Sequence, residues 1–370
     1  MTAPVDLKKA RTRIDELDQQ IHKLIVDRAR VALDIRRIKA DAGDGDGKKG
    51  NDHYRPAREA EVLRRTLTRN RDLKGPLSDE VMARLMREIM SACLALESPL
   101  AVSYLGPEGT YTQAAVYKHF GHQVNARVAT AIDEIFRDVE SGSATYGVVP
   151  IENSTEGIVS STLDLLAATP LSICGEVWLP VHHHLLSNHK KRQDIRKIFA
   201  HAQSFAQCRK WLDDKLPHAE RIAVASNGLA AQMVRKGGKG AAIAGAAAAE
   251  LYRLGTLASN IEDDPNNTTR FLVIGRQNPE PTGRDMTSLV MSAHKDRAGA
   301  LFQLLEPFAQ AGISLTKIES RPSRRAAWDY NFFIDLEGHQ ADARVKPALD
   351  AVQSHAAYFR ILGSYPRAVV

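Results

Sequence analysis

The chain has 370 residues, of which 44% are hydrophobic, and a formal net charge of +6. This length predicts two or three domains with ample core, and the composition excludes disorder for the bulk of the chain. The N-terminus lacks a secretory signal pattern and no apolar run approaches the ~20 residues that span a bilayer, so we expect a cytoplasmic protein without a membrane partner. No arginine-rich tail or aromatic-interleaved basic run appears, so we expect small anionic ligands and no nucleic acid.

The first hundred residues are predicted to be helical. From Val5 to about Ala40, apolar residues recur at helical spacing with no proline or glycine inside. Such a helix is about 50 Å long. It is too long to be covered by the two shorter helices expected at Pro56 to about Asn70 and at Ser78 to Ser98. We therefore predict an interlocked helical homodimer, with higher homo-oligomers left open.

Three cations on the long helix point to an anionic ligand. Arg28 and Lys39 are close to three whole turns apart and share a face, whereas Arg11 points about 100° away from Arg28. If all three serve one anion, Arg11 must serve the site of the other subunit. The alternative is a set of solvated charges on an exposed face.

In the third helix, Glu97 continues an apolar stripe formed by Val81, Leu85, Ile89 and Cys93. A carboxyl group in that place is either paired with a cation or protonated.

Residues 5 to 98 resemble the all-helical chorismate mutase domain at the N-terminus of bacterial P-proteins, which predicts a mutase domain at 1–98. The resemblance rests on the cations above, on the Arg58-Glu59 pair and on Cys93-x-x-x-Glu97. It implies a substrate site made of Arg11, Arg28, Lys39, Arg58, Glu59, Cys93 and Glu97. In that family the two arginines Arg11 and Arg28 bind the carboxylates of chorismate, Lys39 binds the ether oxygen and Glu59 holds the ring hydroxyl.

This site suits a pericyclic rearrangement, which needs only a held conformer and positive charge at the ether oxygen. We hypothesise that Glu97 works as the neutral acid, because only that form can donate a hydrogen bond to the ether oxygen.

From Ala101 onward the pattern alternates between strands and helices. One set of strands is expected at 102–105, 124–128, 146–151 and 172–178, and a second set at 183–186, 197–200, 221–225 and 241–244. Two such sets predict a two-lobed α/β domain with a ligand in the cleft. A strand at 271–274 is expected to return to the first lobe.

Polar residues follow several of these strands. Thr110 ends a glycine-containing loop, Glu152, Asn153 and Ser154 follow a buried strand, and Asn266 to Thr269 stand next to Arg270. The last group suits a small anion at a strand mouth, although a polar turn is the alternative.

Neither a metal nor a disulfide framework is expected. The cysteines Cys93, Cys174 and Cys208 are far apart and odd in number. The run His182 to His184 would be split between opposite faces of a strand, and no carboxylate or cysteine stands at ligand spacing.

Residues 101–278 resemble prephenate dehydratase through Gly-Pro-x-Gly-Thr at 106–110, Glu-Asn-Ser at 152–154, the segment 201–208 and Thr269-Arg270-Phe271. The resemblance implies a fold like that of type II periplasmic binding proteins and catalysis that depends most on Thr269. The expected substrate-binding set is Thr110, Glu152, Asn153, Ser154, Gln207, Thr269 and Arg270. Loss of a ring hydroxyl with a carboxylate needs a proton donor at the hydroxyl. Because a free threonine is a poor acid, we expect Thr269 to hydrogen-bond this hydroxyl and relay a proton, with Arg270 or neighbouring amides setting its field.

After a linker, residues 285–370 predict a compact βαββαβ unit of the ferredoxin-like α+β class. This unit resembles an ACT domain through Gly299-Ala300-Leu301 and Glu319-Ser320-Arg321-Pro322. The resemblance implies that these residues bind L-phenylalanine between subunits. A purely structural dimerisation unit is the alternative.

Together these expectations describe a bifunctional enzyme that converts chorismate to prephenate and then to phenylpyruvate, without a cofactor and under inhibition by L-phenylalanine. One alternative is a prephenate or arogenate dehydratase whose helical domain only dimerises. Another is a non-catalytic amino-acid sensor built on a binding-protein fold, which the presence of Arg11, Arg28, Lys39 and Thr269 together disfavours.

Overall fold

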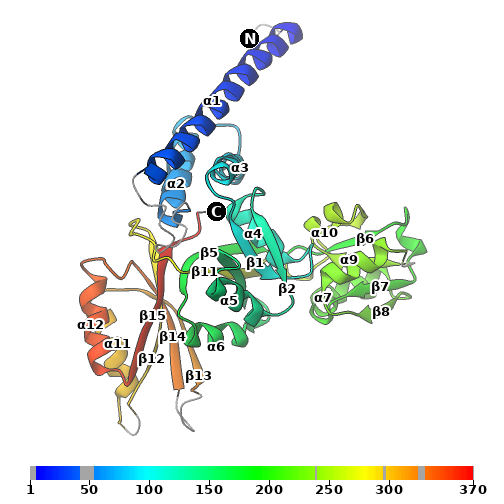
Figure 1. Ribbon diagram of the computed structural model, residues 1–370. Helices are drawn as coiled ribbons and strands as arrows, with labels where there is room; N and C mark the ends of the chain where they lie inside the picture. Colours follow the sequence, from blue (N-terminus) through cyan, green and yellow to red (C-terminus); the bar gives the residue numbers. More distant parts are fainter. Residues whose placement is uncertain (1–5, 42–53, 238–239, 295–296, 324–329, 370) are drawn as a thin grey trace, which may run out of the picture.

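A computed structural model describes residues 6–41, 54–237, 240–294, 297–323 and 330–369, with no side-chain description for 39–41. The chain forms a helical N-terminal domain, a two-lobed α/β middle domain and a C-terminal domain with one sheet (Figure 1). None of the helices that the structure describes combines the length and apolar character needed to span a lipid bilayer.

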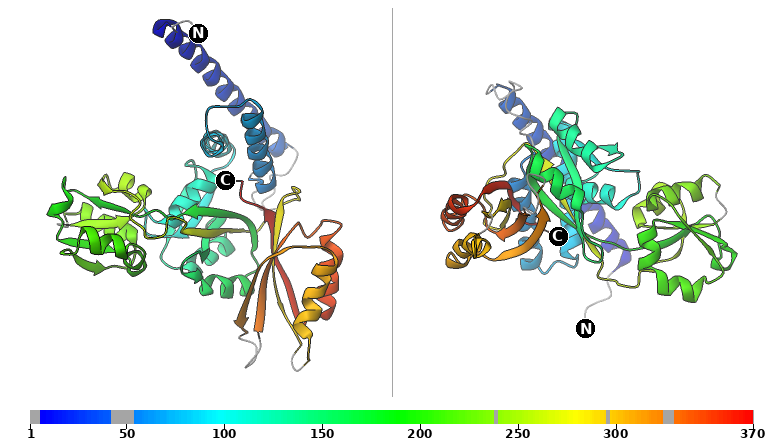
Figure 2. Two further views of the ribbon diagram at one scale, coloured as in Figure 1. Left: turned by 180° about the vertical axis from the view of Figure 1, so that it is seen from behind. Right: turned by 90° about the horizontal axis from the view of Figure 1, so that it is seen from below.

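The helical domain consists of α1 (Leu7–Asp41), α2 (Pro56–Asp72) and α3 (Asp79–Glu97), close to the predicted bounds. Proline at the first position of α2 and the side chain of Ser78, which accepts a hydrogen bond from the Val81 amide at the start of α3, fix the two helix starts. The N-terminal half of α1 extends away from the other domains (Figures 1 and 2). Its large apolar side chains are exposed, for example Leu24 at 68%.

The first lobe of the middle domain is built on one mixed sheet. Its strands are β1 (Ala101–Leu105), β2 (Asn125–Ala129), β3 (Tyr146–Asn153), β4 (Gly157–Ile158), β5 (Ser172–Pro180) and β11 (Thr268–Gly275), in the order β2-β1-β3-β11-β5 with β4 paired to β3. Its helices are α4 (Tyr111–Phe120), α5 (Ile132–Ser141) and α6 (Ser160–Ala168). Strand β11 lies antiparallel between β3 and β5, which confirms the predicted return to this lobe.

The second lobe contains residues between β5 and β11. Its strands are β6 (His184–Ser187), β7 (Lys197–Ala200), β8 (Glu220–Ala223), β9 (Ala241–Ala244) and β10 (Gly255–Ala258), in the order β10-β6-β9-β7-β8. Its helices are α7 (Ala202–Gln207), α8 (Arg209–Lys215), α9 (Asn227–Arg235) and α10 (Ala246–Leu251), with a 3-10 turn at Arg192–Asp194. The short strands β4 and β10 were not predicted.

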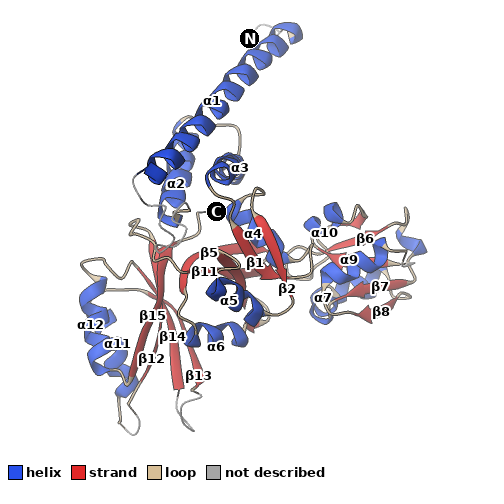
Figure 3. Cartoon of the chain, viewed as in Figure 1, coloured by secondary structure: helices blue, strands red, loops and turns tan. Residues whose placement is uncertain are grey.

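The C-terminal domain packs as a layer on the first lobe. Its strands are β12 (Asp285–Ser292), β13 (Leu315–Pro322), β14 (Tyr330–Glu337) and β15 (Tyr358–Pro366), in the antiparallel order β13-β14-β12-β15. Helices α11 (Ala300–Gln310) and α12 (Val345–His355) cover one face (Figure 3). The other face shares a hydrophobic core with the first lobe, to which it contributes Met286, Val290, Phe333, Leu362 and Tyr365.

The two lobes of the middle domain approach each other closely at Gly228. A Cβ atom there would lie 2.7 Å from the Glu108 carbonyl oxygen and 3.2 Å from Pro107 Cγ. Glycine is required at this place because α9 lies directly against the loop that follows β1.

We expect Gly228→Ala to lower the free energy of unfolding by about 1–3 kcal/mol, because the added methyl group overpacks the contact between the lobes. Urea unfolding followed by fluorescence measures this loss. Gly255→Ala is the milder comparison and should lose less stability, since its Cβ would lie 3.3 Å from the Ser187 carbonyl oxygen, against 2.7 Å at Gly228. Equal stability of the two variants would contradict the close contact.

Candidate active sites

The cleft residues Asn153, Gln207 and Thr269 are brought together where the two lobes meet. Gln207 at the end of α7 donates through Nε2 to Thr155 Oγ1 (3.1 Å) of the first lobe. Its Oε1 accepts from Asn267 Nδ2 (3.1 Å), just before β11. Asn153 and Thr269 face each other in the pairing of β3 with β11. The predicted cleft site therefore forms from elements of both lobes.

The orientation of the Asn153 amide makes the Thr269 hydroxyl oxygen a hydrogen-bond acceptor. Asn153 Oδ1 accepts from the Thr155 and Glu156 amides (3.0 and 3.1 Å) and from Thr155 Oγ1 (2.6 Å). Its Nδ2 must therefore point the other way, where it donates to Thr269 Oγ1 (2.8 Å) and Asn267 Oδ1 (2.9 Å). Because Thr269 Oγ1 accepts this bond, its own proton is left to be donated to a ligand.

Glu152 and Arg270 do not join this cluster, which differs from the expectation for both. Each is the neighbour of a cleft residue on a strand, and successive side chains of a strand point to opposite faces. The Glu152 carboxylate pairs with Lys317 Nζ (2.7 Å) on β13. The side chain of Arg270 is buried among residues of the C-terminal domain. The structure thus gives both residues contacts on the reverse face of the sheet.

Arg270 is the centre of a buried ionic network. Its Nε donates to Glu176 Oε2 (2.9 Å), Nη1 donates to Asp335 and Nη2 donates to the Tyr365 hydroxyl (2.9 Å). Its guanidinium also lies over the Trp178 ring, 5.5 Å from the centroid. Burial would lower the pKa of Arg270, but Tyr365, Asp335 and Glu176 raise it above its ordinary value. Arg270 therefore stays charged.

Thr110 makes local contacts, whereas Ser154 contacts Asn267 and Thr268 at the start of β11. The Thr110 hydroxyl caps α4 by accepting from the Gln113 amide (3.5 Å), and it donates to the Leu105 carbonyl (3.1 Å). Ser154 Oγ accepts from the Thr268 amide (3.0 Å) at the end of the β3–β11 pair. Thr110 thus orders the loop after β1, and Ser154 closes the strand pair that carries the cleft residues.

Asn267 and His183 were not predicted as site residues. Asn267 is 1% exposed and joins Asn153 to Gln207. His183 Nε2 hydrogen-bonds Gln207 Oε1 (2.8 Å), and its Nδ1 meets the Tyr111 hydroxyl (3.0 Å). Burial lowers the pKa of His183, so its ring is neutral. The polar run before β11 held the signal for Asn267, whereas nothing in the sequence set His183 apart from its two histidine neighbours.

The three neighbouring histidines have separate partners. His182 Nδ1 pairs with Glu262 (2.8 Å), and His184 Nδ1 accepts from the Asn260 amide (3.2 Å). Among the residues that the structure describes, no group of three or more His, Cys, Asp or Glu side chains is placed to hold a metal ion.

In the helical domain, Glu59 of α2 lies near Arg28 of α1 and Arg87 of α3. Arg28 Nη1 donates to the Ile89 carbonyl (3.4 Å), which joins α1 to α3. Burial raises the pKa of Glu59 to about 7, against the lowering effect of Arg87 and Arg28. Glu59 therefore titrates near neutral pH.

Glu59 also lines a small cavity of about 50 Å³ between the helical domain and the middle domain. The Tyr54 hydroxyl and His119 Nε2 of α4 form a hydrogen bond (2.9 Å) across this junction. Burial lowers the pKa of His119 to about 3, with a further lowering from Arg87, so the ring is neutral. The carboxylate expected to bind substrate thus lies close to the middle domain.

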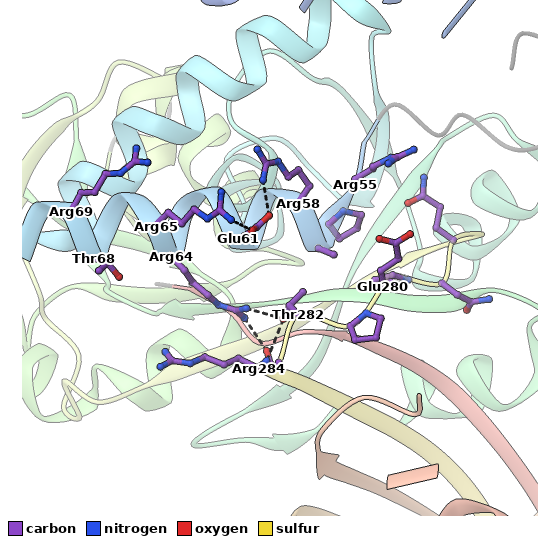
Figure 4. Close-up of a pocket in the computed structure, with 17 residues that line it drawn as sticks. Arg55, Arg58, Glu61, Arg64, Arg65, Thr68, Arg69, Glu280, Thr282 and Arg284 are labelled. Atoms are coloured by element: carbon purple, nitrogen blue, oxygen red, sulfur yellow. Dashed lines mark hydrogen bonds and ion pairs between the residues drawn. The ribbon is translucent and has the colours of Figure 1, made fainter. Parts of the chain in front are cut away.

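Arg58 opens into a different space from Glu59, which differs from the expectation of one shared site within a single chain. Arg58 Nη1 pairs with Glu61 Oε2 (2.6 Å). Arg58 and Glu61 line a groove of about 1340 Å³ between α2 and the linker 277–284 (Figure 4). Further arginines line this groove from α2 and the linker, namely Arg55, Arg64, Arg65, Arg69 and Arg284. On the linker side, Arg64 Nη1 donates to Thr282 Oγ1 (2.8 Å).

The other expected mutase residues are placed as follows. Arg11 is exposed on the projecting half of α1. Lys39 lies in the last turns of α1, and its side chain is outside the described part of the structure. Cys93 is buried, and Glu97 is half-buried at the end of α3. The hypothesis that Glu97 acts as a neutral acid stays a prediction.

The expected effector residues lie at two separate positions in the C-terminal domain. Gly299, Ala300 and Leu301 start α11, where Gly299 has the left-handed φ of 76°. Glu319, Ser320, Arg321 and Pro322 end β13, the edge strand of the sheet. Arg321 pairs with Asp164 of α6 (3.2 Å), so its guanidinium contacts the middle domain.

The fold and these sites define a three-domain class, in which a helical domain precedes a two-lobed α/β domain of the type II periplasmic-binding-protein kind and an ACT-like domain. The chain matches Chorismate mutase type II over residues 10–98, Prephenate dehydratase over residues 102–279 and ACT domain over residues 287–353.

Similar proteins agree with this organisation. A bifunctional chorismate mutase/prephenate dehydratase of Stutzerimonas stutzeri is 51% identical over 373 residues, which cover 100% of each chain. The corresponding protein of Pseudomonas aeruginosa is also 51% identical and covers 98% of each chain. The structure of an Arthrobacter aurescens prephenate dehydratase in complex with L-Phe is 35% identical with a TM-score of 0.68, and the match covers 73% of this chain and 90% of that one. The chain belongs to the family of bifunctional chorismate mutase/prephenate dehydratases.

Proposed function

We propose that the chain converts chorismate to prephenate in its mutase domain and prephenate to phenylpyruvate in its dehydratase domain. Similarity to bifunctional enzymes over the whole length supports this proposal. The observation that carries the dehydratase site is the hydrogen bond from Asn153 to Thr269 where the lobes meet. No cofactor is needed for either reaction, and three buried free thiols suit a reducing cytoplasm.

In the mutase reaction, Arg28 and the Arg11 side chain of a second copy hold the two carboxylates of chorismate in the reactive conformer. By the family resemblance we assign Lys39 to the ether oxygen, where negative charge develops as the carbon–oxygen bond breaks. Ionised Glu59 accepts a hydrogen bond from the ring hydroxyl. Both Arg28 and Arg87 favour this ionised form.

In the dehydratase reaction, the ring carboxylate leaves as carbon dioxide and its bonding electrons enter the ring. The carbon–oxygen bond at the opposite ring carbon breaks, and the oxygen takes a proton and leaves as water. Thr269 donates the hydrogen bond to this oxygen, since Asn153 occupies the acceptor side of its hydroxyl. The proton is supplied from solvent through this contact, and aromatisation drives the reaction.

We propose a homodimer formed through α1, with further assembly open. Large apolar side chains lie exposed along this helix, including Ile14 at 56%, Ile21 at 54% and Leu24 at 68%. With Leu17, which is 41% exposed, these residues recur at steps of three and four positions and make one continuous apolar face. Burial of this face against a second α1 also brings Arg11 to the partner's mutase site.

We propose that L-phenylalanine inhibits the enzyme by binding at the ACT domain between subunits. The start of α11 and the edge strand β13 present exposed apolar side chains, Leu301, Phe302 and Ile318. An apolar effector needs such a surface, and the L-Phe complex of the Arthrobacter aurescens relative supports this choice.

The substrate is tested by supplying purified protein with chorismate, prephenate and arogenate in separate assays. Formation of phenylpyruvate from the first two is expected. A protein that acts only on arogenate, or that lacks mutase activity, would support a dehydratase whose helical domain only dimerises. A protein inactive on all three would leave the amino-acid sensor as the function.

Thr269→Ala should lower the dehydratase kcat by about 100-fold or more, because one donor to the leaving group is lost. Mutase activity should remain, since the variant lies outside the mutase domain. Thr268→Ala is the matched control, because its hydroxyl donates to the Asn266 carbonyl. Near-normal dehydration by Thr269→Ala would remove Thr269 from the mechanism.

Mutase kcat/KM should rise as pH increases from about 6 to 8, because Glu59 loses its proton across the pKa of about 7 and only then accepts the substrate hydroxyl bond. Glu59→Gln should lower the activity and flatten this profile. Glu80→Gln on the exposed start of α3 serves as the control. An unchanged pH profile in Glu59→Gln would exclude this role.

Ile21→Asp should convert the dimer to monomers and abolish mutase activity, because charge is placed in the apolar face and Arg11 no longer reaches a partner. Light scattering coupled to size exclusion measures the mass. Gln19→Asp, on the opposite side of the helix, should leave mass and activity unchanged. A dimeric Ile21→Asp protein would place the subunit interface elsewhere.

A further inference from the structure

The strands that carry the dehydratase cleft pair are held from behind by the ACT domain. Asn153 and Thr269 face the cleft, and their chain neighbours Glu152 and Arg270 face the ACT sheet. Glu152 and Arg270 are also opposite each other in the pairing of β3 with β11. Each cleft residue is therefore one residue away from an ion pair to another domain.

The first ion pair joins β3 to the edge strand of the ACT sheet. Lys317 Nζ lies 2.7 Å from Glu152 Oε2, and the Lys317 side chain is only 14% exposed. Lys317 stands two residues before Glu319 on β13, so both side chains point to the same face of that strand. The Lys317–Glu152 pair thus lies on the same face of β13 as the predicted effector residue Glu319.

The second ion pair joins β11 to the inside of the ACT sheet. Asp335 of β14 accepts from Arg270 through Oδ2 and from the Ser288 hydroxyl through Oδ1 (2.6 Å). Ser288 also hydrogen-bonds the Tyr365 hydroxyl (2.8 Å), which accepts from Arg270. The Asp335 carboxylate therefore bonds Ser288 of its own domain and Arg270 of the middle domain at the same time.

The pairing of β3 with β11 is irregular at this point, although β11 pairs regularly with β5 over the same residues. Arg270 pairs with Glu152, but the next residue, Phe271, pairs with Pro150, which leaves Ile151 as an extra residue on β3. Such a bulge disrupts the ladder and turns the strand end. Pro150 also has no amide hydrogen to donate. Side-chain contacts on the reverse face therefore add to the backbone pairing that β5 and β4 give these strand ends.

We propose that Lys317 and Asp335 of the ACT domain are positioning residues of the dehydratase reaction, which hold Asn153 and Thr269 in place through Glu152 and Arg270. The ACT domain is then part of the catalytic framework as well as a sensor. This inference rests on the proposed dehydratase activity. It also assigns Glu152 a role through Lys317, in place of the substrate contact expected from the resemblance.

The single variants Lys317→Gln and Asp335→Asn are compared with the wild-type chain. We expect the dehydratase kcat for prephenate to fall by about 10- to 100-fold, because small displacements of positioned groups have effects of this size. KM should stay within about twofold, and mutase activity, measured on the same samples, should be unchanged. If Asp335→Asn does not fold, the proposal is tested by Lys317→Gln alone. Lys317 lies on the edge strand β13, where its substitution should not prevent folding.

The charge-swapped double variant Glu152→Lys with Lys317→Glu separates positioning from substrate contact. If Glu152 acts through Lys317, the swap should restore dehydratase kcat to within about threefold of wild type. Glu337→Gln, which breaks the exposed pair with Arg367 on the same ACT strand as Asp335, is the matched control and should have wild-type activity.

The inference is overturned if Lys317→Gln keeps wild-type kcat, or if the swap remains as inactive as Glu152→Lys alone. The second result would make Glu152 a substrate-binding residue. A wild-type chain without dehydratase activity would instead refute the proposed function, so the two failures are distinguishable.

Discussion

The buried guanidinium of Arg270 is the constraint on which the C-terminal two thirds of the molecule depend. It is 5% exposed and bonded to Glu176, Asp335 and Tyr365. A buried charge that loses its partner is strongly destabilising, at about 3–5 kcal/mol. Strand β11 and the ACT sheet must therefore stay in one fixed relation. The shared hydrophobic core beneath them has the same effect.

Because successive side chains of a strand point to opposite faces, neighbouring residues of β3 and β11 contact different domains. Asn153 and Thr269 face the cleft, whereas Glu152 and Arg270 face the ACT domain. A short polar motif of this kind contains both the chemistry and the contacts that hold it. Residues adjacent in the motif therefore need not share a function.

The mutase domain is joined to the rest by different means. Tyr54 bonds His119 across the junction, and Val369 near the C-terminus packs on the core of α2 and α3. Glu59 lies beside this junction, where burial raises its pKa. The apolar face of α1, by contrast, finds no cover within the described chain. The helix that carries Arg11 and Arg28 is thus only partly covered by its own chain.

The sequence by itself determined the class of each domain, the three helices and most strands, and it singled out Asn153, Gln207 and Thr269, which the structure brings together. These follow from local periodicity and from motifs whose backbone order is fixed by neighbours in the chain. Only the tertiary structure decided that Glu152 and Arg270 face the ACT domain and that Arg58 and Glu59 open into different spaces. The physical reason is distance along the chain: Arg270 finds Asp335 65 residues away and Glu152 finds Lys317 165 residues away. No local pattern specifies which distant charge will neutralise a buried one.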